Sequence, residues 1–99
     1  MELLVKAYIN GNTAVSYEDG QRCYEDILPY LNRGEKIILN FDGIEYVITA
    51  FLNPIIGDLI LEKGIEIMKN IDIVNASQKT IEKIKMVKDG ALLKREDME

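Results

Sequence analysis

Two polar residues of this 99-residue sequence lie where they could form a site together. An apolar run at residues 37–41 ends at Asp42 and Gly43, and Thr49 then opens a strongly apolar segment. If the run is a strand and the segment a helix, Asp42 and Thr49 lie at the strand's carboxyl end, where sites form in open α/β sheets. Both residues also have structural interpretations. Asp42-Gly43 suits a turn, and a Thr49 N-cap would stabilise the helix by about 1 kcal/mol.

The residues that most enzymes use for catalysis are missing. The chain has no histidine, which removes the commonest general base and metal ligand. It also lacks a cysteine pair, a glycine-rich phosphate loop and a Gly-x-Ser-x-Gly motif. Its one cysteine, Cys23, falls on the apolar face of a predicted helix and is expected to be an inert core thiol. We therefore expect no enzymatic activity, no cofactor and no metal site.

Composition and charge narrow the class of protein. The net charge of −5 disfavours nucleic acid as a partner, because phosphate binding needs concentrated Lys and Arg. No apolar run reaches the ~18 residues of a membrane helix, and the first residues lack the basic start of a secretory signal. A single cysteine excludes an internal disulfide and suits a reducing compartment. We expect one cytoplasmic domain spanning residues 1–99, frayed from about residue 91, with no membrane contact.

Hydrophobic periodicity and turn residues predict the order β-β-α-β-α-β-α. The first two strands, at 3–9 and 13–17, would form a hairpin around Asn10-Gly11. The remaining elements are expected at 21–32 (helix), 36–41 (strand), 46–48 (short extended piece), 49–63 (helix), 71–74 (strand) and from Ser77 to before Gly90 (helix). The strand at 36–41 is apolar on both faces and should be covered by helices on two sides. The class is therefore α/β, with a mixed, mainly parallel sheet.

A compact motif in residues 40–60, NFDGIEYVITAFLNPIIGDLI, resembles the STAS-like domains grouped as DUF4325, bacterial and archaeal relatives of the anti-sigma-factor antagonists. The matching pieces are residues 40–44, 48–53 and 57–59, in a segment that spans about a fifth of the chain, and the element order agrees throughout. The resemblance implies a STAS-like fold. It also implies a regulatory, non-enzymatic protein-binding module that docks a GHKL-type kinase, an anti-sigma-like factor or another signalling partner.

The resemblance further implies a phosphoacceptor at the start of the second long helix. That position falls at Thr49 or Ala50, and only Thr49 has a hydroxyl. Many relatives carry a Ser-Arg pair before the first helix, where this chain has Ser16-Tyr17 and so lacks a guanidinium that could pair with phosphate. Partner binding is therefore favoured over phospho-switching as the expected function.

The second long helix also carries a strip of small or apolar residues opposite its core-facing stripe, namely Ala50, Pro54, Gly57 and Leu61, with Asn53 beside them. We call this the small-residue strip. An uncharged strip can be buried cheaply, so we expect partner-binding residues here and in the preceding loop: Asp42, Gly43, Thr49, Ala50, Asn53, Pro54, Gly57 and Leu61. On this hypothesis Gly57→Arg abolishes binding and spares the fold.

Three alternatives stay open at the level of sequence. Another helix of the same domain could cover the small-residue strip. The chain could be a structural or oligomerising module that forms a homodimer without phospho-regulation. A small-ligand sensor is a weaker alternative, because phosphate-binding glycines and a basic pocket are both absent.

Overall fold

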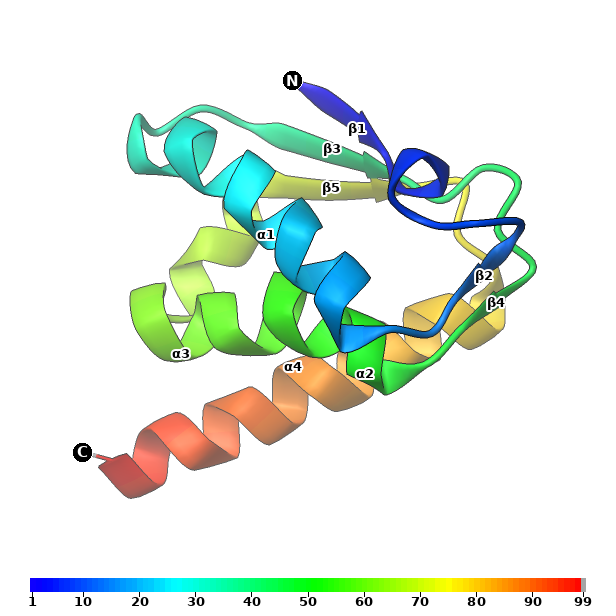
Figure 1. The fold of residues 1–99 in the computed structure, drawn as a ribbon. Helices are drawn as coiled ribbons and strands as arrows, with labels where there is room; N and C mark the ends of the chain where they lie inside the picture. Colours follow the sequence, from blue (N-terminus) through cyan, green and yellow to red (C-terminus); the bar gives the residue numbers. More distant parts are fainter. Residues whose placement is uncertain (99) are drawn as a thin grey trace.

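The computed structural model describes the backbone of residues 1–98 and the side chains of residues 1–96. A three-stranded parallel sheet forms one side of the molecule and the helices form the other (Figure 1). Its strands lie in the order β1 (Glu2–Leu4), β3 (Ile37–Asn40) and β5 (Ile71–Val74). A second parallel pair joins β2 (Thr13–Ala14) to β4 (Tyr46–Val47). The α/β class and the mainly parallel sheet are confirmed.

The helices lie on the inner side of the three-stranded sheet, with α4 packed against other helices (Figure 1). Their bounds are α1 (Tyr17–Asn32), α2 (Thr49–Leu52), the π-helical segment η2 (Asn53–Asp58), α3 (Leu59–Lys63) and α4 (Gln78–Met98), with two 3-10 helices, η1 (Val5–Tyr8) and η3 (Ile65–Asn70). The consecutive segments α2, η2 and α3 form what we call the composite helix, residues 49–63. Its predicted apolar stripe is buried throughout, at Phe51, Leu52, Ile55, Ile56, Leu59 and Ile60. The composite helix is therefore the centre of the core.

Helix α1 begins four residues before its predicted start. The Ser16 Oγ accepts a hydrogen bond from the Asp19 backbone N–H at 3.3 Å, which caps the helix. Asp19 and Gly20 therefore lie inside the first turns and do not break the helix. The lack of a side chain at Gly20 lets α1 approach the composite helix. A Cβ atom there would lie 2.2 Å from the backbone oxygen of Phe51 and 2.9 Å from the Pro54 Cγ.

The predicted N-terminal hairpin is wrong. Strand β1 ends at Leu4, η1 follows, and β2 pairs in parallel with β4. Gly11 does have a positive φ of 79°, but Asn10 does not, so the two-residue turn that requires both is not formed. Pairing of β2 with β4 buries Ala14 beside Val47. Tertiary burial has therefore prevailed over the local turn signal.

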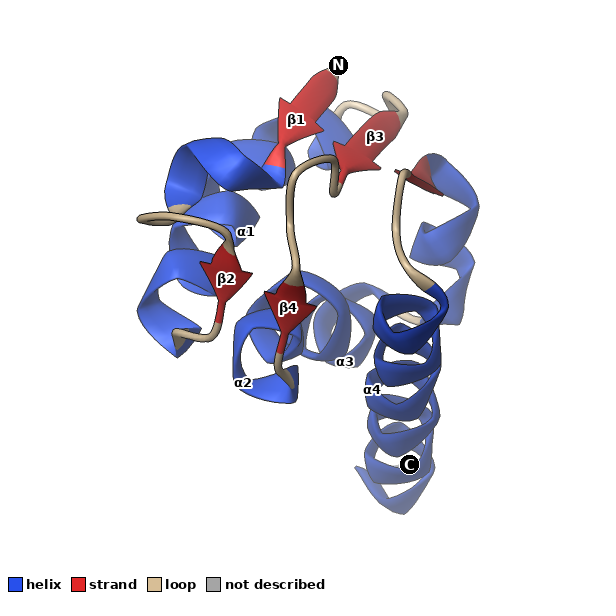
Figure 2. Cartoon of the chain, turned by 90° about the vertical axis from the view of Figure 1, so that its right-hand side faces the viewer, coloured by secondary structure: helices blue, strands red, loops and turns tan. Residues whose placement is uncertain are grey.

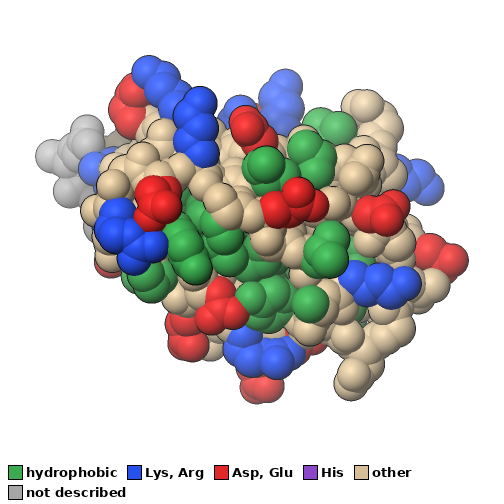
Figure 3. All heavy atoms as spheres, turned by 90° about the horizontal axis from the view of Figure 1, so that it is seen from above, with side chains coloured by type: hydrophobic (Ala, Val, Ile, Leu, Met, Phe, Trp, Pro, Cys, Tyr) green, Lys and Arg blue, Asp and Glu red, His purple; other side chains and the backbone are tan. Residues whose placement is uncertain are grey.

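The expectation that helices cover both faces of β3 is also wrong. Among the described residues, helices lie on one face of the β1–β3–β5 sheet only (Figures 1 and 2). Leu39 is buried on the inner face, while Ile38 on the outer face is half-buried and Leu4, on the same face of β1, is 51% exposed. Figure 3 looks onto this side and shows hydrophobic side chains gathered at the surface.

Helix α4 is longer than predicted. Ser77 caps it as expected, because its Oγ accepts from the Thr80 backbone N–H at 3.2 Å. The helix then passes through Gly90 and continues to Met98, so the predicted frayed tail is helical in residues 91–98, while Glu99 lies outside the described residues. In the described part of the chain, no helix is both long and apolar enough to cross a membrane.

Candidate functional site

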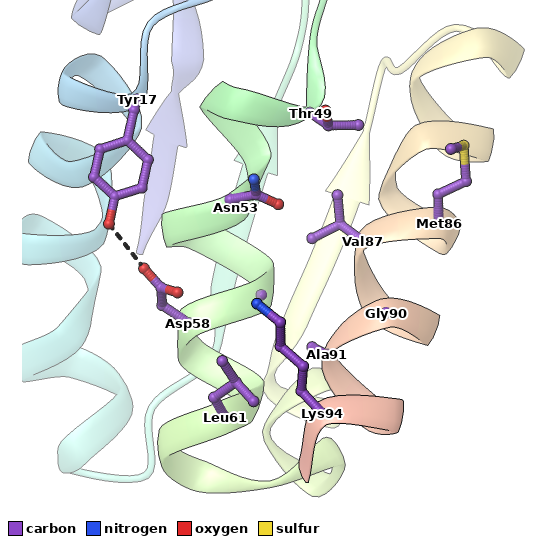
Figure 4. A pocket seen from close by; sticks show the side chains of 11 residues that line it. Tyr17, Thr49, Asn53, Asp58, Leu61, Met86, Val87, Gly90, Ala91 and Lys94 are labelled. Carbon is purple, nitrogen blue, oxygen red and sulfur yellow. Dashed lines mark hydrogen bonds between the residues drawn. The ribbon is translucent and has the colours of Figure 1, made fainter. Parts of the chain in front are cut away.

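A groove of about 390 Å³ runs between the composite helix and α4. Figure 4 shows its two walls and the side chains that line it. The composite helix contributes Thr49, Asn53, Gly57, Asp58 and Leu61; α4 contributes Met86, Val87, Gly90, Ala91 and Lys94; α1 contributes Tyr17. The groove thus combines apolar side chains with hydroxyl, amide, carboxylate and ammonium groups.

Thr49 lies at one end of this groove. Its predicted role as an N-cap is wrong, because Ile48 occupies the N-cap position with an extended backbone and Thr49 is the first helical residue. The Thr49 side chain is half-buried and points from the composite helix toward α4 (Figure 4). Its position therefore places a hydroxyl beside the groove and does not serve to cap the helix.

The small-residue strip is not the open surface that its sequence suggested. Pro54 and Gly57 are both buried. Helix α1 covers Pro54 through its approach at Gly20, and the Val87 side chain of α4 would lie 3.3 Å from a Cβ atom at Gly57. The alternative that helices of the same domain cover the strip is thus correct for these two residues. An arginine at Gly57 would push α4 away, so Gly57→Arg tests stability before it tests binding.

The other predicted partner-binding residues divide between two places. Asn53, which is exposed, and Leu61, which is half-buried, line the groove with Thr49. Ala50 is half-buried and is not part of the lining.

Asp42 and Gly43 form an exposed turn after β3, outside the groove lining. In that turn the Ile44 N–H donates to the Phe41 carbonyl oxygen at 3.1 Å, and the Asp42 N–H donates to the Asn40 Oδ1 at 2.9 Å. Hydrogen bonds of the turn therefore explain Asp42 without a ligand.

Sequence reasoning missed the wall that α4 contributes. Met86 is 64% exposed and lies beside the core-facing Val87. Its signal was available in the sequence, because Met86 is an apolar residue off the stripe formed by Ile84, Val87 and Ala91. A predicted helix end at Gly90 hid the rest of this wall, including Lys94.

A hydrogen bond between α1 and the composite helix closes the other side of the groove. The Tyr17 hydroxyl donates to the Asp58 Oδ2 at 3.1 Å, as the dashed line in Figure 4 marks. This hydrogen bond to a carboxylate raises the pKa of Tyr17, so the phenol stays protonated and keeps its role as a donor. Tyr17 remains 44% exposed, and its ring offers an apolar surface to an incoming molecule.

The side chains of the groove suit binding. Met86 and Leu61 offer apolar contact, while Thr49 and Asn53 can donate and accept hydrogen bonds.

Burial raises the pKa of the Cys23 thiol to about 12, so this group stays protonated within the core. In residues 1–96, no three acidic or thiol side chains gather in an arrangement that could hold a metal ion.

Comparison with known proteins identifies the family. A family model described as a STAS-like domain of unknown function (DUF4325) matches residues 19–80, more than half of the chain. The chain belongs to the STAS-like DUF4325 family. No curated protein and no solved structure matches it. In this STAS-like domain the composite helix lies inside the matched region, whereas Met86 and the rest of the α4 wall lie beyond it.

Proposed function

We propose that this STAS-like domain is a non-enzymatic regulatory module that docks a signalling protein at the groove between the composite helix and α4. The exposed Met86 carries the proposal, because a flexible thioether at the edge of a groove that half-buried Leu61 and the exposed Tyr17 also line offers an adaptable apolar contact. Hydrogen-bonding groups at its edge would orient the partner. By resemblance to the anti-sigma-factor antagonists, the partner is a GHKL-type ATPase that acts as kinase and target, in the cytoplasm.

The position of Thr49 supports regulation of this docking by phosphorylation. A phosphate on Thr49 would add nearly two negative charges at the groove. Asp58 already contributes a carboxylate to the same lining. The added charge would repel a partner seated between the two helices and release it.

Binding to a GHKL-type ATPase from the same organism tests the docking surface by isothermal titration calorimetry. Met86→Glu places a charge in the apolar contact and should weaken binding at least about tenfold, or ~1.4 kcal/mol. Ile81→Glu is the matched control, because Ile81 is on the same helix, is also a large exposed apolar residue (46%) and does not line the groove. Equal loss of affinity in both variants would contradict the proposed site.

Phosphorylation is tested by incubating the domain with that ATPase and ATP and weighing the product by mass spectrometry. Wild type should gain the mass of one phosphate, Thr49→Ser should keep the gain, and Thr49→Ala should lose it. An unchanged mass in wild type, or an equal gain in Thr49→Ala, removes Thr49 as the acceptor while leaving the docking test intact.

A second candidate function, homodimerisation without phospho-regulation, is favoured by the outward face of α4. Met86 and Leu93 are both 64% exposed and, seven residues apart, lie on the same side of the helix. Two copies could pack these residues together. Light scattering distinguishes the candidates: a dimer that dissociates in Leu93→Glu supports homodimerisation, and a monomeric wild type rejects it.

A further inference from the structure

The outer face of the β1–β3–β5 sheet has a regular arrangement of apolar and acidic side chains. Strand register aligns Glu2, Ile38 and Asp72 in one row across the three strands. The next outward-facing row, two residues on, contains Leu4, Asn40 and Val74. All six are at least partly exposed. Figure 3 shows hydrophobic side chains on this face with acidic groups among them and Lys or Arg groups around them.

This exposure is unusual for a parallel sheet. Parallel sheets occur almost only with both faces covered, yet here the described helices cover the inner face alone. Leu4 is 51% exposed, and Ile38 and Val74 are only half-buried. Apolar side chains left exposed together on an uncovered sheet face favour an interaction site. A missing layer on the sheet would remove these side chains from water and complete a three-layer arrangement.

The charges on the face indicate what could form that layer. Glu2 and Asp72 are exposed on either side of Ile38, and the Glu2 Oε2 accepts from the Asn40 Nδ2 at 2.8 Å. Positive charge lies at one end of this face, because Lys36 and the Met1 amino group, which donates to the Lys36 carbonyl oxygen at 3.3 Å, are both at the amino end of the strands. A second copy would bring the same carboxylates and another net charge of −5 to the face. Like charges in contact oppose such an association, whereas a basic partner would be attracted.

We propose that this outer sheet face docks an amphipathic helix of a partner protein. The apolar stripe of the helix covers Leu4, Ile38 and Val74, and its Lys or Arg side chains pair with Glu2 and Asp72. Helix-on-sheet packing of this type is the usual way in which an α/β protein covers a parallel sheet. The face lies on the opposite side of the molecule from α4 (Figure 1), so this binding is separate from docking at the groove.

An 18-residue synthetic peptide of leucine and lysine, patterned to form an amphipathic helix and labelled for fluorescence anisotropy, tests the proposal. The peptide should bind wild type, and a peptide with glutamate in place of lysine should not. Asp72→Lys should weaken binding at least about fivefold, because it reverses an attractive charge. The matched control, Asp89→Lys, makes the same change at an exposed site on α4 and should leave affinity within about twofold.

The binding site is checked by amide chemical shifts in NMR spectra. Shifts in β1, β3 and β5 support docking on the sheet. Shifts confined to groove residues such as Asn53 and Met86, an equal loss of affinity in Asp72→Lys and Asp89→Lys, or no binding would each overturn the proposal. So would a wild-type dimer in light scattering that Leu4→Glu disrupts, because it would identify the occupant as a second copy. The result with the peptide does not change the outcome of the separate binding test with the GHKL-type ATPase.

Discussion

At the scale of single residues, two helical glycines occupy opposite environments. Gly20 lies in α1, where a Cβ atom would come within 2.2 Å of the Phe51 backbone oxygen. Gly90 lies in α4, where an added Cβ atom would meet nothing within 4 Å. Alanine is the better helix former by about 1 kcal/mol, so intrinsic propensity favours both replacements equally. The surroundings decide the sign of the effect.

Gly20→Ala should destabilise the domain by about 1–3 kcal/mol, since α1 must move away from the composite helix. Gly90→Ala should stabilise it by up to about 1 kcal/mol. Urea unfolding followed by circular dichroism measures both changes. Equal shifts of the two midpoints would mean that α1 does not pack against the composite helix as closely as the structure shows.

At the scale of elements, local pattern determined what the sequence could predict. Strand 71–74 and the buried stripe of the composite helix follow from periodicity within one segment. The hairpin failed because pairing of β2 with β4 depends on residues more than 30 positions away. The predicted end of α4 was wrong because Gly90, though a poor helix former, lies between Val87 and Ala91, and burial of these two residues in the core keeps the helix continuous.

The candidate site could be predicted only in part for the same reason. Thr49, Asn53 and Leu61 share one helix, so their spacing brought them together in the sequence. Covering of Pro54 and Gly57 depends on α1 and α4, which no local pattern within residues 49–63 reports. The π-helical segment is a further departure. Pro54 has no N–H to complete the regular helical hydrogen bond. The π-helical segment accommodates this missing hydrogen bond within the composite helix.

Arg95 joins α4 to the end of the composite helix. Its guanidinium donates to the Leu61 carbonyl oxygen at 2.7 Å and to that of Ile60 at 3.5 Å. Cationic side chains stabilise the last carbonyls of a helix. Arg95→Met keeps an unbranched apolar stem but removes these donors, and should lower the free energy of unfolding by about 1 kcal/mol.

Thermal unfolding of Arg95→Met measures that loss, with Lys94→Met as the neighbouring control. Lys94 is exposed, and its replacement should change the melting temperature far less. A similar decrease in both variants would show that loss of charge alone, and not the contact with the composite helix, lowers stability.

At the scale of the whole molecule, the two proposed docking surfaces lie on opposite sides of one shared core. The groove is bounded by α4, and the outer sheet face lies across the inner layer of helices from it (Figure 1). The composite helix contributes to the groove and packs beneath the sheet. Because both surfaces depend on this helix, a variant that loosens the core, such as Gly20→Ala, should weaken both. A variant at an exposed residue of one surface should weaken binding at that surface alone.

Buried titratable groups also make the stability of the domain depend on pH in the alkaline range. Burial raises the pKa of Cys23 from 9.0 to about 12. Burial, followed by hydrogen bonds to Asp26 and Glu62, raises the pKa of Tyr8 and Tyr24 above their usual 10.0. Above about pH 9 the unfolded chain releases these protons while the native state retains them. Stability must therefore fall as pH rises, because the native state then binds more protons than the unfolded state.

Urea unfolding at about pH 8 and about pH 10.5 should show a loss on the order of 2 kcal/mol, of which the buried thiol alone can account for most. Cys23→Ala lowers stability at both pH values through its cavity, but it should make the decline between them shallower. Met86→Ala, an exposed apolar change without a titrating group, should leave the slope as in wild type. A flat or rising profile in wild type would mean that water reaches the Cys23 thiol in the native state, and that α1 does not seal this side of the core.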